Sequence, residues 1–374
     1  MAKQAGLLEN RVKTLFSTDP SKIYVNTATT GLTPLPAVAA MKDAIDGFAS
    51  GSTEIREKCD EAAEQFRRLL PAFIGKGCLS EQICLVSTVA EGMSFVAAAV
   101  GPNDEILIAD DDFASTILPF KSKAQRVGCK IRIVPFKNLV SEVKQTTTWF
   151  VASHVQSNTG RVLNLDQLSK KTKECNLKVV LDVSHSVGIL EIEPLKYGFD
   201  FVVGACYKHL LCPKGTAFVW MSDEGQDAIR PPVACSWAGL EAPPLYYGPS
   251  LDHLRQDATA FDQSIPWILY PGALECLRVF HDLGLSTVRK HCVSLATKMA
   301  EELGLPPTGS SFACFRVSDT EEALRRCKEA KVVVAIRDGG VRVSWHIYNT
   351  ISQVEQVVTI FRPLLSTKTG MESH

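Results

Sequence analysis

Seven short apolar runs recur between residues 83 and 221, separated by polar and amphipathic stretches. The runs are ICLVS (83–87), EILIAD (105–110), KIRIVPF (130–136), TWFVASHV (148–155), KVVLDV (178–183), DFVVGACY (200–207) and AFVWM (217–221). Each has the length of a β-strand, and continuous apolarity is typical of strands buried on both faces of a sheet. The amphipathic stretches 90–100, 115–127 and 165–175 predict helices. This alternation predicts an α/β fold, with a mainly parallel seven-stranded sheet between helices.

The pattern changes in the C-terminal third of the chain. Residues 230–270 are dense in Pro, Gly and aromatic residues and predict an ordered but irregular segment. A long helical stretch at 271–303 precedes strands and helices that predict a small α+β domain; these are expected at 312–318, 320–329, 331–337, 340–347 and 351–365. Residues 1–20 predict a short amphipathic helix. We therefore expect an N-terminal helical segment at 1–20, a large domain at 21–265 and a small C-terminal domain at 266–374.

Composition and charge exclude several classes of protein. The 374 residues carry 40 Lys and Arg against 41 Asp and Glu, a net charge of −1, so we expect no nucleic-acid partner. No window reaches the ~18 apolar residues of a membrane span. The N-terminus lacks the apolar core of a secretory signal, and the twelve cysteines include no C-x-x-C pair. These features predict a cytoplasmic protein with reduced thiols, no metal site and no membrane contact.

Polar residues follow almost every predicted strand. They are Ser87-Thr88, Asp110 to Phe113, His154 to Asn158, Asp182 to His185 and Tyr207-Lys208. In open α/β sheets, ligands bind at the carboxyl ends of the strands. A buried lysine can act as a free amine and form a Schiff base, and an aspartate can hold a pyridinium nitrogen protonated. A helix that opens after VST (86–88) offers free backbone amides to a phosphate.

These residues resemble the class V branch of fold type I pyridoxal-phosphate enzymes, which includes class V aminotransferases, cysteine desulfurases and isopenicillin-N-epimerase-like proteins. The resemblance covers about residues 22–365. Its segments occur in family order: IYVNTATTG (23–31), VSTVAEG (86–92), DDFASTILPF (111–120), SHVQSNTGRV (153–162), LDVSHSVG (181–188), GACYKHLLCPKG (204–215) and VRVSWHIYNT (341–350). It implies the cofactor pyridoxal 5'-phosphate and a large domain followed by a small α+β domain.

The resemblance implies a role for each matched residue. Lys208 is the Schiff-base lysine, which also transfers the proton. Asp182 is the partner of the pyridine nitrogen, His185 contacts the ring hydroxyl, and Phe113 stacks on the ring. The other implied cofactor contacts are Thr88, Val89 and Ala90 in the phosphate turn, Tyr207 at the phosphate, Ser157 at the ring hydroxyl, and Ser264 in place of a Gly-Thr pair given to the neighbouring subunit's phosphate. The implied substrate contacts are Asn26, Gln156 and Arg342, and Arg342 grips the α-carboxylate.

One departure from the family pattern bears on the reaction. KVVVAIR runs through DGG directly into VRVS, which leaves no room for the loop that carries a nucleophilic cysteine in SufS-type desulfurases. No cysteine lies between Cys327 and the C-terminus, so a persulfide-transferring desulfurase is not expected. Cys206 and Cys212, on either side of Lys208, are interpreted as packing residues.

Three kinds of function stay open. A C–S or β-lyase or another biosynthetic class V enzyme, with an amino-acid substrate, is favoured. An aminotransferase is the alternative, although it needs a second dicarboxylate site for which only Arg337 is available. Epimerisation or a bond-forming biosynthetic reaction at the α-carbon also stays open, and a non-catalytic binding protein is the third hypothesis. By resemblance, a homodimer is expected, with the active site at the interface between the subunits.

Overall fold

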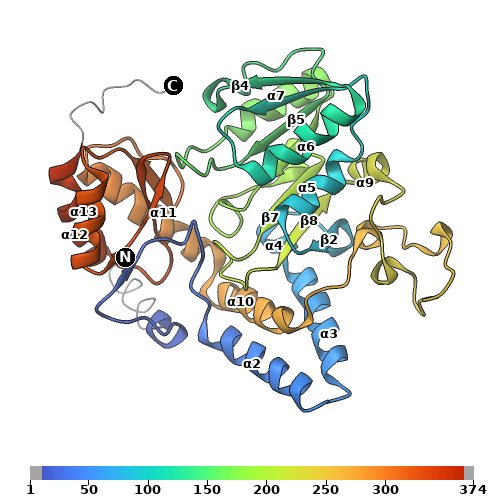
Figure 1. Ribbon diagram of the computed structural model, residues 1–374, viewed down its shortest axis with the longest axis horizontal. Coiled ribbons are helices and arrows are strands. Elements are labelled where there is room, and N and C mark those ends of the chain that lie inside the picture. The colour runs from blue at the N-terminus through green and yellow to red at the C-terminus, as the bar shows by residue number, and fades with distance from the viewer. Residues whose placement is uncertain (1–10, 366–374) are drawn as a thin grey trace.

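The computed structural model describes residues 11–365, and its centre is a seven-stranded sheet (Figure 1). The strands are β2 (Ile83–Val86), β3 (Glu105–Ala109), β4 (Lys130–Val134), β5 (Trp149–Ser153), β6 (Lys178–Asp182), β7 (Phe201–Ala205) and β8 (Ala217–Met221). Their order is β2-β8-β7-β6-β5-β3-β4, and β8 is the one strand that runs opposite in direction to the other six. The predicted mainly parallel seven-stranded sheet is therefore confirmed.

The sheet is buried on both faces, as continuous apolar strands require. Alternate residues of one strand enter two different cores: Ile106 and Ile108 join one, and Leu107 and Ala109 join the other. The first core is covered by α5 (Val89–Ala97) and α6 (Ala114–Val127). The second is covered by α2 (Leu35–Ala49), α3 (Ile55–Leu69), α7 (Leu165–Cys175) and α10 (Tyr270–Leu283). The remaining short helices of the sheet domain are α4 (Pro71–Ile74), α8 (Pro194–Tyr197) and α9 (Asp223–Ile229).

The C-terminal part forms a second, smaller sheet covered by helices, beside the seven-stranded sheet. Strands β9 (Phe312–Phe315), β11 (Ala335–Arg337) and β12 (Gly340–Ser344) form an antiparallel sheet in the order β11-β12-β9. Helices α11 (Leu285–Glu302), α12 (Thr320–Glu329) and α13 (Ile351–Phe361) cover one face, where Val341 and Val343 are buried. Because side chains alternate along a strand, Arg342 lies on the opposite face. The α+β character predicted for this part is confirmed, while the domain boundaries stay a prediction.

Two predicted elements are divided in the structure. The helical stretch at 271–303 is broken at Gly284, which has a φ of 80° and separates α10 from α11. The strand predicted at 331–337 consists of β10 (Val332–Val333) and β11. β10 pairs in parallel with β1 (Ile23–Tyr24), so the N-terminal segment crosses to the small sheet. This crossing brings the chain after residue 24 between the two sheets.

Two segments outside the strand-helix pattern were also predicted: a helix at 1–20 and an irregular segment at 230–270. Residues 1–10 of the expected N-terminal helix lie outside the described residues, and 11–15 are helical. Val12 and Phe16 are buried, and the ring of Phe16 packs edge-on against Tyr348 at 5.2 Å. Residues 230–269 contain short 3₁₀ turns and one isolated β-bridge, between Leu240 and Leu254, and so form an irregular segment as predicted. This segment extends from the sheet domain at the right of Figure 1.

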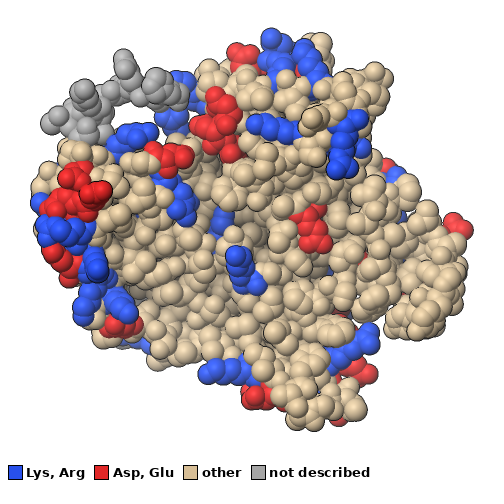
Figure 2. All heavy atoms as spheres, in the orientation of Figure 1, with Lys and Arg blue, Asp and Glu red and all other residues tan. Residues whose placement is uncertain are grey.

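The surface carries both signs of charge. On the face drawn in Figure 2, basic and acidic side chains are interspersed, in agreement with the net charge of −1. Within residues 11–365, no helix combines the length and apolarity needed to cross a membrane.

Candidate active site

Lys208 is buried three residues beyond the end of β7, at the carboxyl edge of the sheet, and is only 7% exposed. Its Nζ lies 3.1 Å from Nε2 of His185 and 5.3 Å from the ring centroid of Phe113. Burial, together with the charges of two nearby arginines and against that of Asp182, lowers the pKa of Lys208 to about 8. The structure therefore places a buried amine with a lowered pKa beside the ring of Phe113.

Asp182 is the last residue of β6 and is buried. Its Oδ1 accepts a hydrogen bond from the backbone amide of Ser184 at 2.8 Å, and its Oδ2 accepts one from Thr116 Oγ1 at 2.8 Å. Two donors hold the carboxylate in one orientation. Thr116, from α6, was not among the predicted site residues.

A second carboxylate, Asp112, is buried close by. It accepts hydrogen bonds from the amide and hydroxyl of Ser153, at 2.7 and 2.6 Å, and from the amide of Phe113 at 2.7 Å. Burial and, to a smaller extent, repulsion by Asp182 raise the pKa of Asp112 to about 6. Asp112 thus anchors the turn that carries Phe113 onto the end of β5. Phe113 itself is 46% exposed, so one face of its ring is open.

His185 connects the lysine to the segment after β5. Its Nε2 lies 3.3 Å from Ser157 Oγ, and its Nδ1 is buried without a partner among the described residues. Burial and the charge of Lys208 lower the pKa of His185 well below its usual range, so the ring is neutral. His185 therefore offers one unused polar atom beside the lysine.

Arg342 reaches the same cluster from the small sheet. Its Nη1 donates to the carbonyl and hydroxyl oxygens of Ser157, at 3.0 and 3.1 Å, and its Nη2 donates to Thr29 Oγ1 at 2.7 Å. The side chain is 2% exposed, and its Nε has no partner among the described residues. Burial lowers the pKa of Arg342 to about 10. Three segments far apart in sequence thus meet at one guanidinium.

The predicted phosphate turn opens helix α5. Thr88 is the N-cap residue, and its Oγ1 accepts from the amide of Glu91 at 3.2 Å. The amides of Val89 and Ala90 have no acceptor within the helix, because the first residues of a helix lack one. Thr88 and Ala90 are exposed. The helix N-terminus is therefore open to an anion.

The backbone around the lysine is tightly fixed. The amide of Gly31 donates to the carbonyl of Tyr207 at 2.9 Å. A Cβ on Gly31 would lie 2.3 Å from the carbonyl oxygen of Lys208, so only glycine allows the N-terminal segment to come this close. Cys206 and Cys212 beside the lysine are buried, and burial raises the pKa of Cys212 well above its usual range. Their environment is that of packing residues.

The remaining predicted residues are placed as follows. Gln156 is buried and donates to the carbonyl of Asp111 at 3.3 Å. Asn26 forms a β-bridge with Ser344, and its side-chain oxygen is buried without a partner among the described residues. Ser264 is exposed and makes no hydrogen bond with another residue within 11–365, and its contact with the neighbouring subunit's phosphate stays a prediction.

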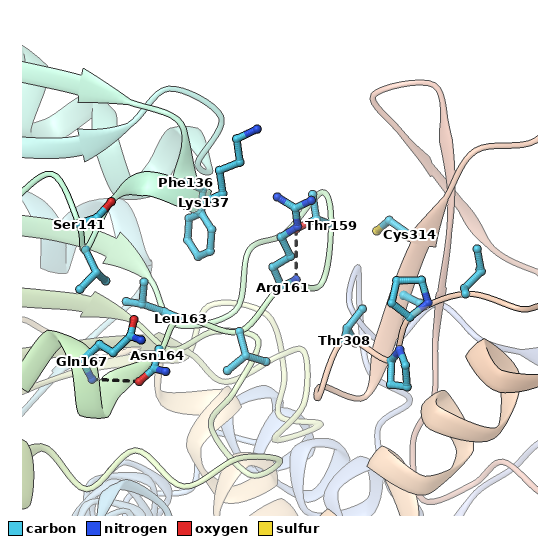
Figure 3. A pocket seen from close by; sticks show the side chains of 16 residues that line it. Phe136, Lys137, Ser141, Thr159, Arg161, Leu163, Asn164, Gln167, Thr308 and Cys314 are labelled. Carbon is cyan, nitrogen blue, oxygen red and sulfur yellow. Dashed lines mark hydrogen bonds between the residues drawn. The ribbon is translucent and has the colours of Figure 1, made fainter. Parts of the chain in front are cut away.

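A cleft of about 590 Å³ lies between the segment after β5 and the small sheet (Figure 3). Thr159 and Arg161 line one wall, and Thr308 and Cys314 line the other. Cys314 lies directly opposite Arg342 in the pairing of β9 with β12. The cleft therefore adjoins the arginine end of the cluster, although Lys208 is not among its lining residues.

The residues present fit the cofactor implied by the resemblance. Lys208 supplies an amine for an aldehyde, Asp182 a fixed carboxylate for a ring nitrogen, and Phe113 an open aromatic face. The helix N-terminus at residues 88–90 supplies free amides for a phosphate. The unpartnered atoms, Nδ1 of His185 and Nε of Arg342, lack hydrogen bonds that a polar ligand would provide.

Comparison with known proteins gives the family. The sequence model of the family named Aminotransferase class-V matches residues 23–304. The uncharacterized aminotransferase YcbU of Bacillus subtilis is 21% identical over 371 residues, 94% of this chain and 96% of the relative. Isopenicillin N epimerase of Amycolatopsis lactamdurans is 26% identical over 330 residues, 77% of this chain and 82% of the relative.

The fold has solved counterparts. The cystine C–S lyase C-DES, solved in complex with its reaction product cysteine persulfide, superposes with a TM-score of 0.83 at 16% identity, over 93% of this chain and 99% of that one. This likeness shows the fold, and the family match, which spans most of the chain, shows the family. The chain belongs to the class V aminotransferase family of pyridoxal 5'-phosphate enzymes and has their fold type I architecture.

Proposed function

We propose that this protein acts on an amino acid at its α-carbon, with Lys208 as the residue that binds the cofactor covalently. The observation that carries the proposal is the buried Lys208 amine, which lies 5.3 Å from the Phe113 ring and has a pKa lowered to about 8. When bound, pyridoxal 5'-phosphate supplies an electron sink for the pair left by a broken bond at the α-carbon. Lys208, once free, is the base and acid that moves the proton.

The other cofactor contacts follow from the same placement. Asp182, oriented by Thr116 and the amide of Ser184, keeps the ring nitrogen protonated. Phe113 covers one ring face, and His185 with Ser157 faces the ring hydroxyl. The phosphate end is assigned to Thr88, Val89, Ala90 and Tyr207, with Ser264 of the neighbouring subunit.

The substrate end is assigned to Arg342, Gln156 and Asn26. A guanidinium binds a carboxylate through two parallel hydrogen bonds, and the unpartnered Nε of Arg342 has the geometry for one of them. Ser157 holds Arg342 and also contacts His185, so the substrate and cofactor groups are positioned by one residue.

For the reaction we favour a C–S or β-lyase, or a related biosynthetic enzyme, without a persulfide cysteine. Cys314 is the cysteine paired across the sheet with Arg342. Burial raises its pKa to about 12, which keeps the thiol protonated and a poor nucleophile. The likeness to a cystine C–S lyase supports this choice. An aminotransferase is the second candidate, and it is favoured by Arg337, which shares the Thr29 hydroxyl with Arg342 and supplies a second guanidinium.

The first experiment separates these reactions. Purified holoenzyme is incubated with cysteine, cystine, alanine and glutamate, each with and without a keto acid. We expect pyruvate from a sulfur-bearing substrate without any added keto acid. Product that appears only with a keto acid would assign the aminotransferase instead. A bound cofactor with no turnover across a broad amino-acid panel would indicate the non-catalytic binding protein.

We further propose a homodimer. In the 230–269 segment, Val233 is 71% and Tyr247 is 91% exposed, which is unusual for large apolar residues without a partner. Val233 lines a surface hollow together with Leu118 and Ala90, the last of which lies in the proposed phosphate turn. A second copy of the chain covering this surface would therefore complete the phosphate end of the site.

Charging this surface is expected to separate the subunits. The double variant Val233→Asp/Tyr247→Asp should be monomeric by light scattering and should lose cofactor on gel filtration, because the phosphate end is left open. Leu324→Asp, at an exposed apolar position on α12, is the matched control and should remain dimeric. A wild-type monomer, or a double variant that stays dimeric, would contradict the proposed interface.

A cytoplasmic location is also proposed. All twelve cysteines lie within the described residues and all are free thiols. Unpaired cysteines in this number are typical of a reducing compartment.

A further inference from the structure

Two arginines of the small sheet, Arg337 and Arg342, donate hydrogen bonds to the same hydroxyl group. Arg337 lies on β11 and Arg342 on β12, and Ala335 is the direct partner of Arg342 across the two strands. Residues 335 and 337 share a face, because side chains alternate along a strand. Both guanidiniums therefore lie on the face turned toward the active site. They meet at Thr29, whose Oγ1 accepts from Nη2 of Arg342 at 2.7 Å and from Nη2 of Arg337 at 3.1 Å.

The charges of this pair are not balanced within one subunit. Among the described residues, neither Arg337 nor Arg342 pairs with a carboxylate, whereas the buried Arg67 pairs with Asp262. Placing like charges together in a partly buried site costs free energy unless an anion compensates them. The arrangement is therefore suited to a ligand with more than one negative group.

The two arginines differ in depth. Arg342 is buried and held by Ser157, next to the cofactor end of the site. Arg337 is partly exposed, one residue before the hairpin turn at 338–339. The carboxylate of Asp338 in this turn accepts a hydrogen bond from the side chain of Asn158 at 3.0 Å and does not pair with Arg337. Nη1 of Arg337 donates to the carbonyl oxygen of Ile336, while Nη2 donates to the neutral hydroxyl of Thr29. The guanidinium of Arg337 is therefore not paired with a carboxylate of the described residues and keeps donor capacity for a ligand.

We propose that the substrate is an amino acid with a second carboxylate in its side chain, and that Arg337 binds this carboxylate while Arg342 binds the α-carboxylate. This inference rests on the proposed function and names its substrate class. Arg337 is accordingly a specificity-determining residue. A neutral amino acid of the same length would leave the outer charge uncompensated and would bind more weakly.

Binding of unreactive acids tests the proposal without turnover. Dissociation constants of glutarate and butyrate are measured by calorimetry on the holoenzyme and on Arg337→Gln and Arg337→Lys. Because a hydrogen-bonded charge pair is lost, Arg337→Gln should weaken glutarate about 10- to 100-fold and leave butyrate within about twofold. Arg337→Lys should recover part of the glutarate affinity. Arg325→Gln, which removes one charge from α12 on the covered face of the small sheet, should change neither.

Steady-state kinetics give a second readout. In Arg337→Gln, the KM for a substrate with a second carboxylate, which is cystine for a C–S lyase and glutamate for an aminotransferase, should rise by a similar factor with kcat little changed. The KM for a substrate without that carboxylate, cysteine or alanine respectively, should stay the same. Equal weakening of glutarate and butyrate would overturn the proposal, because both arginines would then bind a single carboxylate. No change for either acid would also overturn it and would leave Arg337 as a support for Thr29. Failure of the proposed function is distinguishable from these outcomes, because it would appear as the absence of a covalently bound cofactor.

Discussion

Lys208→Ala is expected to abolish the covalent attachment of pyridoxal 5'-phosphate and to lower kcat by roughly 10⁴-fold, because one change removes both the nucleophilic amine and the proton carrier. The wild-type protein should show a visible absorption band that disappears on borohydride reduction, and the variant should lack it. Reduction followed by peptide mass spectrometry should place the cofactor on the peptide that contains Lys208. A band of normal intensity in the variant would contradict the proposed attachment.

The lowered pKa of Lys208 gives this prediction a pH dependence. Only the neutral amine attacks an aldehyde, and the pKa is lowered from 10.5 to about 8. Below about pH 7 the amine is mostly protonated, and above about pH 9 it is mostly neutral. The rate at which the apoprotein takes up the cofactor should therefore rise between these values and then level off, whereas an ordinary lysine would give a rate that still increases.

Lys214 is the matched control for Lys208. It is exposed, six residues further along the same loop, and makes no hydrogen bond or ion pair with another described residue. Lys214→Ala removes an equal charge, yet it should keep the absorption band, the pH profile and the turnover. A similar loss in both variants would show that the loop, rather than the Lys208 amine, had been disturbed.

The large domain was predictable because its strands are short, continuously apolar and separated by amphipathic helices. EILIAD at 105–110 became β3 at Glu105–Ala109, and its alternate residues fill both cores. The small domain was predicted less accurately at residues 331–337. The partner of β10 is β1, which lies about 300 residues earlier, and no local pattern shows that two residues will leave the strand to pair with it.

Parts of the site were predictable for a related reason. Asp182 is the last residue of β6 and Lys208 follows β7, and these two strands are parallel neighbours. Their common position at the carboxyl ends of the strands therefore follows from the topology. Thr29 and Thr116 were missed although both lie in segments that carry the resemblance, IYVNTATTG and DDFASTILPF, because the sequence does not show which hydroxyl of a polar segment will face the site. The convergence of Arg337 with Arg342 depends on the hairpin and on the N-terminal crossing, which only the structure shows.

Asp182→Asn is expected to give the second-largest loss, lowering kcat by roughly 10²- to 10³-fold, in line with the removal of one preorganised electrostatic group. The side chain keeps its size, and its oxygen can still accept from the amide of Ser184. The negative charge that holds a proton on the ring nitrogen is lost. Cofactor binding should persist, because Lys208 and the phosphate turn are unchanged, so the defect should appear in kcat rather than in cofactor content.

The same substitution should shift two neighbouring groups in a direction that the charges determine. Asp182 raises the pKa of Lys208 and also raises that of Asp112. Without this negative charge both pKa values should fall, so the pH profile for cofactor uptake by the apoprotein should move to lower pH. Uptake is measured by absorbance in wild type and variant under the same conditions. A shift to higher pH would contradict the placement of the carboxylate beside the amine.

Asp200 is the control that separates site chemistry from strand support. It is also a largely buried carboxylate; it accepts a hydrogen bond from the amide of Val179 at 2.8 Å, where β6 begins, and burial raises its pKa to about 6. Asp200 lies at the amino ends of β6 and β7, whereas Asp182 lies at the carboxyl end of β6. Asp200→Asn should therefore change thermal stability without changing kcat or the uptake profile. If both variants lost activity equally at equal cofactor content, the role of Asp182 would be to support the strand rather than to hold a charge at the ring.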